Sequence, residues 1–230
     1  MTRAVLLDAL GTLLELEDPG PPLAAALTDL GAAVTVEEAR RAVLAEMTFY
    51  RAHHDEGSDA ERLVALRRRC AEVLRDELPA HAGALGLGRL TTALLGALRF
   101  APYPEVPGVL SRLRDRGLRL IVVSNWDVSL HEQLAATGLD ALVDGAVSSA
   151  EVGAGKPQPP LFERALALAG VGAADALMVG DSPDTDIAGA VALGIGAVLV
   201  DRWGAAAPPR PPTRRIASLA ELPALIESMA

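Results

Sequence analysis

The segment AVLLDALGTL, at Ala4–Leu13, decides the fold that the sequence predicts. Its first four residues are apolar, the run ends at Asp8, and Gly11 and Thr12 then interrupt any regular pattern. A short apolar run that stops at polar and flexible residues is typical of a buried parallel strand that enters a loop. We therefore predict a strand over Ala4–Leu7 with Asp8 at its carboxyl end.

Three later apolar runs have the same form, at Leu118–Val123, Ala176–Val179 and Ala197–Val200, and each ends at polar residues or glycine. Segments with helical periodicity lie before and between them, at Val109–Arg116, Val128–Thr137, Pro160–Ala169 and Ile187–Leu193. Strands that alternate with helices form a parallel sheet covered by helices on both faces. The sequence therefore predicts an α/β fold with a Rossmann-like three-layer core.

Residues 15–98 follow a different pattern, with helical periodicity and no convincing strand. Apolar faces predict four helices there, around Leu23–Leu30, Ala39–Met47, Leu63–Leu74 and Leu90–Leu98. The prolines at 102, 104 and 107 mark the return to the α/β core. We predict two domains, a core made of residues 1–14 and 99–230 and an inserted all-helical domain over 15–98.

The C-terminal part contains a proline-rich stretch, GAAAPPRPPT, at 204–213. Proline lacks the backbone N–H that a helix or a central strand needs, so we expect an extended surface connection there. A last helix is predicted at Leu219–Met229.

The composition is that of a globular protein and argues against binding to nucleic acid or to a membrane. Half of the residues are hydrophobic and the formal net charge is −9. Such a charge disfavours binding to nucleic acid or to an anionic membrane surface. Cys70 is the single cysteine, which excludes an internal disulfide and suits a reducing compartment. We expect a cytoplasmic globular protein with no nucleic-acid or membrane partner, and no pattern predicts an oligomeric state.

Polar side chains gather where the predicted strands end. Ligands of parallel α/β sheets bind outside the carboxyl ends of the strands, so these positions are candidates for one common site. They are Asp8 with Thr12, Ser124 with Asn125, and Asp181 with Asp184 and Asp186. Lys156, within GAGKPQP, lies between the second and third of these groups in the sequence and adds one cation.

These segments together resemble the four motifs of the haloacid dehalogenase-like hydrolase superfamily. The motifs are DALGTL at Asp8–Leu13, VVSN at Val122–Asn125, Lys156 followed by Pro157, and GDSPDTD at Gly180–Asp186. The resemblance spans nearly the whole chain, and the helical insert stands where the superfamily has its small helical cap. It implies a phosphatase-like hydrolase that acts on a small phosphorylated metabolite.

The resemblance also implies a role for each site residue. Asp8 is the expected nucleophile and forms an aspartyl phosphate, and Lys156 stabilises the transition state. The ligands expected for Mg²⁺ are Asp8, the Leu10 carbonyl and Asp181. Asp186 is expected to support the metal through a bound water or through hydrogen bonds to the ligands. Those expected for the phosphoryl oxygens are Thr12, Ser124, Asn125 and Lys156. A divalent cation removes the repulsion between a carboxylate and a phosphate, and Mg²⁺ prefers oxygen ligands.

One position departs from the phosphatase pattern. Phosphatases of this superfamily usually carry a second Asp two residues after the nucleophile, and this chain has Leu10 there. A positioned acid or base contributes ~10²–10⁴-fold in rate. Two alternatives therefore stay open: a metal-independent 2-haloacid dehalogenase, with Arg40 or Arg41 as its substrate arginine, and a catalytically weakened binding protein. The phosphonate hydrolases of the superfamily use a lysine of the cap to form an imine. Residues 15–98 contain no lysine, so this activity is disfavoured.

Overall fold

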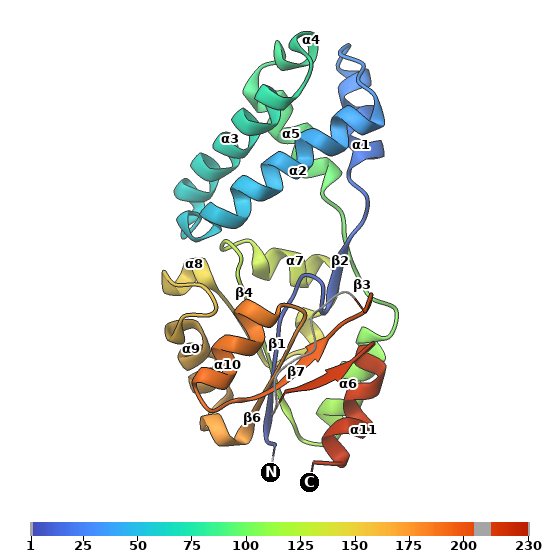
Figure 1. Ribbon diagram of the computed structural model, residues 1–230. Coiled ribbons are helices and arrows are strands. Elements are labelled where there is room, and N and C mark those ends of the chain that lie inside the picture. The colour runs from blue at the N-terminus through green and yellow to red at the C-terminus, as the bar shows by residue number, and fades with distance from the viewer. Residues whose placement is uncertain (1, 205–212, 230) are drawn as a thin grey trace. The chain divides into compact units, whose positions relative to one another are not determined.

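The computed structural model of the chain describes residues 2–204 and 213–229. It divides into two compact units, one made of Met1–Glu15 and Pro102–Ala230 and the other of Leu16–Ala101 (Figure 1). The first unit holds the α/β sheet, and the second is helical.

The sheet of the first unit confirms the predicted fold class. Within the described residues, six strands lie in the order β5-β4-β1-β6-β7-β8, and every neighbouring pair is parallel. Their bounds are β1 Ala4–Leu7, β4 Arg119–Ser124, β5 Gly145–Ser148, β6 Ala176–Gly180, β7 Gly196–Val200 and β8 Arg214–Ile216. The first strand therefore lies in the interior of the sheet, between β4 and β6.

Helices cover both faces of this sheet, which makes the three layers (Figure 1). On one face, α9 (Pro159–Ala169) and α10 (Ala188–Ala192) share an apolar cluster with Leu6 of β1. The other core helices are α6 (Val106–Asp115), α7 (Leu130–Ala136), α8 (Ser149–Val152) and α11 (Leu222–Glu227). All four residues of β1 are completely buried. Burial of a Leu or Val side chain contributes ~1.5–3 kcal/mol, so this strand is firmly held and fixes the position of the residue that follows it.

Four short strands were not predicted. β5 and β8 lie at the edges of the sheet. The sequence of β8 is RRI and that of β5 is GAVS, so neither has the apolar run of an interior strand. The prediction of no strand near residue 15 is wrong, because β2 (Leu14–Leu16) pairs with β3 (Phe100–Pro102) in a small second sheet. Strands of three residues are too short to show an alternating pattern.

The C-terminal segment is described only in part. Most of the proline-rich connection predicted at 204–213 lies outside the described residues. The predicted last helix is divided into a 3₁₀ turn at Leu219–Glu221 and α11. Ser218 caps this turn and exchanges hydrogen bonds with Glu221, which fixes where the segment begins.

The helical unit contains the four predicted helices and one short additional helix. They are α1 Gly20–Asp29, α2 Val36–His53, α3 Ala60–Glu77, α4 Ala80–Gly83 and α5 Leu87–Ala97. Leucine and alanine side chains from all five form one buried cluster. Thr35 and Glu38 form a capping box at the start of α2. None of the described helices combines the length and the hydrophobicity that a membrane span requires.

Candidate active site

Asp8 is the first residue after β1, and it lies between two neighbouring strand ends. Leu7 pairs with Val122 of β4 and with Val179 of β6. The residues that follow these partners, Ser124 and Asp181, are therefore brought to the same edge of the sheet as Asp8. Asp8 is 7% exposed, so its carboxylate has little contact with solvent.

The loop after Asp8 is a tight turn that brings Asp181 close. The Ala9 carbonyl accepts hydrogen bonds from the amides of Thr12, Leu13 and Leu14, at 3.3, 2.8 and 2.8 Å. Gly11 has a φ of +88°, and a Cβ atom at this position would stand 2.2 Å from Asp181 Oδ2. Glycine is therefore required for two reasons, the left-handed backbone and the close approach of the Asp181 carboxylate.

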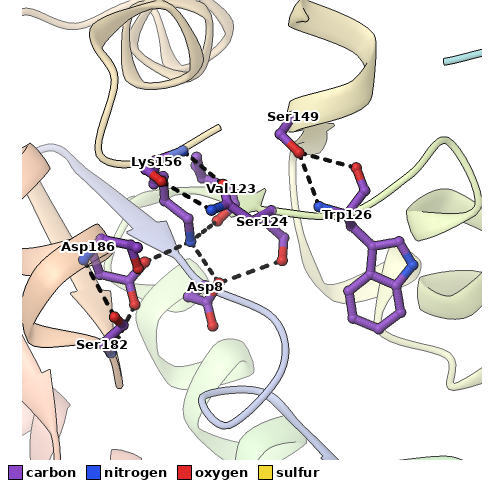
Figure 2. Close-up of polar contacts among 10 residues, drawn as sticks. Asp8, Val123, Ser124, Trp126, Ser149, Lys156, Ser182 and Asp186 are labelled. Atoms are coloured by element: carbon purple, nitrogen blue, oxygen red, sulfur yellow. Dashed lines mark hydrogen bonds and ion pairs between the residues drawn. The ribbon is translucent and has the colours of Figure 1, made fainter. Parts of the chain in front are cut away.

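Lys156 connects two of the carboxylates (Figure 2). Its ammonium donates hydrogen bonds to Asp8 Oδ1 at 2.6 Å and to the Val123 carbonyl at 2.8 Å, and it lies 2.6 Å from Asp186 Oδ1. Its side chain is only 1% exposed. Burial alone would lower the pKa of Lys156, but the negative charges of Asp186 and Asp8 outweigh burial and raise it. The side chain therefore stays a cation at neutral pH.

The charge state of Asp8 is set by opposing influences. Burial raises the pKa of Asp8 to about 7, Lys156 opposes this rise, and the nearby carboxylates of Asp186 and Asp181 add to it. One ammonium does not neutralise three carboxylates, so the site has an excess of negative charge. Such an excess favours the binding of a cation.

The donor set fits a divalent cation. One carboxylate oxygen from each of Asp8, Asp181 and Asp186 lies within 4.8 Å of the other two. Ligand oxygens around an octahedral Mg²⁺ with bonds of about 2.1 Å stand roughly 3–4 Å apart, so a small adjustment closes the set. The carbonyl of Leu10 accepts no hydrogen bond from any described residue, which leaves it available as a further oxygen ligand.

The two acidic residues after β6 occupy different surroundings. Asp181 is exposed, whereas Asp186 is 1% exposed. Asp186 Oδ2 accepts a hydrogen bond from the Ser182 amide at 3.0 Å, and its carboxylate lies so close to Gly180 that a Cβ there would stand 2.2 Å away. Asp186 is therefore rigidly held, and Asp181 faces solvent.

The residues predicted to bind phosphoryl oxygens lie in this region but differ in their partners. Ser124 Oγ donates to Asp8 Oδ1 at 3.4 Å. Thr12 is completely buried, and its Oγ1 has no hydrogen-bond partner among the described residues. The Asn125 amide instead brackets the main chain of Lys156, accepting from its N–H at 2.7 Å and donating to its carbonyl at 3.0 Å. Through these two hydrogen bonds, Asn125 holds the main chain of Lys156 in place.

A second bracket holds the chain beyond Ser124. Ser149 Oγ accepts a hydrogen bond from the Trp126 amide at 3.1 Å and donates to the Trp126 carbonyl at 3.2 Å (Figure 2). Both residues are buried. This contact fixes the segment that follows β4, and no motif in the sequence indicated it.

Sequence reasoning also left Arg202 unassigned. This residue follows β7, and its guanidinium donates to the carbonyls of Gly11 and Thr12 in the loop after Asp8. Its neighbour Trp203 is 84% exposed. The available signal was the position of Arg202 two residues beyond a predicted strand end, on the same edge of the sheet as Asp8.

Comparison with known proteins gives a consistent result. Residues 2–194 match the family described as haloacid dehalogenase-like hydrolase. Over 105 residues the chain is 43% identical to a phosphoserine phosphatase of Thermus thermophilus, a match that covers 45% of this chain and 42% of that protein. The chain spans about half the length of the curated relatives that it matches.

Solved structures of two kinds share the fold over nearly the whole chain. A phosphatase of this superfamily from Thermococcus onnurineus has a TM-score of 0.68 at 27% identity, with 98% of each chain covered. A 2-haloacid dehalogenase from Pseudomonas syringae has a TM-score of 0.70 at 28% identity, with 100% of each chain covered. The family match covers most of the sequence, and the fold and the strand-end carboxylates agree with it. The chain belongs to the haloacid dehalogenase-like hydrolase family.

Proposed function

We propose that this protein is a Mg²⁺-dependent phosphatase that hydrolyses a small phosphorylated metabolite through an aspartyl phosphate on Asp8. The observation that carries the proposal is the convergence of Asp8, Asp181 and Asp186 within 4.8 Å of one another, with the Lys156 ammonium 2.6 Å from Asp8. A reaction at carbon would also use Asp8 as its nucleophile, but it needs no cation. The mutual repulsion of three adjacent carboxylates is relieved by a cation, which favours the metal-dependent reaction.

In the proposed first step, a carboxylate oxygen of Asp8 attacks phosphorus and the bond from phosphorus to the substrate oxygen breaks. That oxygen leaves with the bonding electrons and takes a proton from solvent to become the alcohol. Mg²⁺, held by Asp8, Asp181 and the Leu10 carbonyl with Asp186 in support, would lower the repulsion between nucleophile and phosphate. The Lys156 ammonium stabilises negative charge on the transferred group, and Ser124 and Thr12 bind its oxygens. Water then attacks phosphorus and loses a proton to solvent, and the P–O bond to Asp8 breaks, which restores the carboxylate and releases phosphate.

Leu10 shapes the expected substrate preference. The leaving alcohol needs a proton, and a leucine side chain cannot supply one. We therefore expect aryl phosphates, whose leaving groups are stable as anions, to react faster than alkyl phosphates by more than their intrinsic difference.

We also propose that the helical unit serves as the cap that selects the substrate. The chain inserts this unit directly after the nucleophile loop, and it has its own buried core. Residues 15–98, the range predicted from the sequence, would then be replaceable as a block to alter specificity.

The test uses purified protein and p-nitrophenyl phosphate with and without Mg²⁺. We expect phosphate release that requires Mg²⁺ and that Asp8→Asn abolishes. Asp184→Asn is the matched control, because Asp184 is an exposed carboxylate of the same GDSPDTD segment that does not belong to the three-carboxylate group. Equal activity of Asp8→Asn and the native protein would overturn the proposal.

A 2-haloacid dehalogenase is the second candidate, because Leu10 matches an enzyme that needs no leaving-group acid. Two observations weigh against it. Arg40, one of its candidate substrate arginines, is bound to Asp18 through Nε at 3.0 Å and Nη2 at 2.5 Å. That reaction also needs no cation, so it leaves the convergence of Asp8, Asp181 and Asp186 unexplained. Release of halide from 2-chloropropionate without metal would favour the dehalogenase.

A further inference from the structure

The two peptide groups on either side of Thr12 are held at both ends. Arg202 donates from Nε to the Gly11 carbonyl at 3.3 Å and from Nη2 to the Thr12 carbonyl at 2.9 Å. The amides that share these planar peptides, those of Thr12 and Leu13, both donate to the Ala9 carbonyl. Because a peptide group is rigid, these four hydrogen bonds restrain both backbone torsions of Thr12.

Arg202 is itself held by two side chains, Glu105 and Tyr103. Its Nη1 donates to Glu105 Oε1 at 2.7 Å, and its guanidinium carbon lies 3.5 Å from the centre of the Tyr103 ring. Ser218 Oγ donates to the same Glu105 oxygen at 3.0 Å. The side chains of Arg202 and Glu105 are only 11% and 21% exposed, so solvent screens this ion pair weakly. A planar guanidinium can serve the carboxylate and both carbonyls at once, and the ammonium of lysine cannot.

We propose that Arg202 is a positioning residue that orients Thr12, whose buried hydroxyl has no hydrogen-bond partner among the described residues. A buried hydroxyl without a partner is unfavourable unless a ligand engages it, so its orientation matters most when a ligand is bound. The residues that match the family end at 194, and Arg202 lies beyond them. The loop-positioning part stands on geometry alone, whereas the effect on phosphate binding rests on the function proposed above.

The first test is hydrogen exchange of the Thr12, Leu13 and Leu14 amides in metal-free protein, which needs no activity. Arg202→Ala and Arg202→Lys should both raise exchange at these amides by about tenfold or more, because each loses charge-assisted hydrogen bonds. Arg116→Ala is the matched control. Arg116 lies near the start of β4, and its guanidinium makes the same kinds of contact as that of Arg202. It donates to the Pro223 carbonyl at 2.8 Å and to the Glu227 carboxylate. Unchanged exchange in both Arg202 variants would overturn the proposal.

The second test asks whether Arg202 acts through Thr12. On an aryl phosphate with Mg²⁺, Arg202→Lys should raise KM by about tenfold in the native background and by less than threefold in Thr12→Val, since residues that act as one unit are non-additive. Equal effects in both backgrounds would contradict the proposal. If the native protein released no phosphate from any ester, the proposed phosphatase function would fail, while the exchange experiment would still decide whether Arg202 positions the loop.

Discussion

Replacement of Lys156 by methionine removes the buried cation at the centre of the site and keeps an unbranched side chain. The Lys156 ammonium lies 2.6 Å from both Asp8 and Asp186, and the side chain is 1% exposed. Loss of one partner from a buried ion pair costs about 3–5 kcal/mol of stability, because the remaining charges stay buried without compensation. We expect a loss of this size for Lys156→Met at pH 8 in the absence of metal.

The sign of the pH dependence follows from Asp8. Its pKa in the folded protein, about 7, lies above the usual 3.8, and Lys156 opposes that rise. Removal of Lys156 therefore raises the pKa of Asp8 further. A raised pKa lowers stability as pH rises from the unfolded value, 3.8, to the folded value, and the loss is complete above the folded value. In the native protein this loss ends near pH 7, whereas in Lys156→Met it continues to a higher pH. The stability difference between Lys156→Met and the native protein should thus be larger at pH 8 than at pH 5.5.

The assay is urea unfolding followed by circular dichroism at both pH values without Mg²⁺. Arg3→Met is the matched control, because Arg3 forms a surface ion pair with Asp175 at 3.8 Å and its side chain is 65% exposed. Such pairs contribute less than about 1 kcal/mol. A loss for Lys156→Met no larger than that of the control at pH 8, or one independent of pH, would refute the reasoning.

Three further predictions concern the metal and the proton. Mg²⁺ must displace the proton of Asp8, so calorimetry should show an apparent affinity roughly tenfold weaker at pH 6 than at pH 8 for a pKa near 7; equal affinities would contradict this. Leu10→Asp should raise the turnover of alkyl phosphates by about 10²–10⁴-fold, and the absence of any gain would show that the reaction does not use an acid there. Gly11→Ala should weaken Mg²⁺ binding, because its Cβ would meet Asp181 at 2.2 Å, whereas Gly138→Ala, with φ +70° and open space, should not.

The interior of the sheet could be predicted because its strands are continuous apolar runs that stop at polar residues. β1 and β6 each have this form, and the structure places them side by side. The edge strand β8 could not be predicted in this way. Its sequence begins with two exposed arginines, so its strand conformation depends on pairing with β7 and not on local pattern.

Some residues of the candidate site could be predicted from the sequence, and some of its contacts could not. Asp8, Ser124 and Asp181 could be expected to converge, because the carboxyl ends of parallel strands share one edge of a sheet. Lys156 lies in the loop between α8 and α9, and only the resemblance to the family indicated that it belongs to the site. Their roles in catalysis stay predictions. The contacts of Arg202 with the nucleophile loop could not be foreseen, because they depend on how far a long side chain reaches from the end of β7. Asn125 shows the same limit, since its sequence position places it at the site but does not reveal that its amide binds the Lys156 main chain.

The proposed function requires above all that Asp8 and Asp181 bind the same divalent cation. Crystals of the protein grown with Mn²⁺ in place of Mg²⁺ would show the ion directly by its anomalous scattering. We predict one strong peak within coordination distance of carboxylate oxygens from both residues, and no such peak in Asp181→Asn. A peak elsewhere, or the two carboxylates too far apart to reach a common ion, would contradict the account.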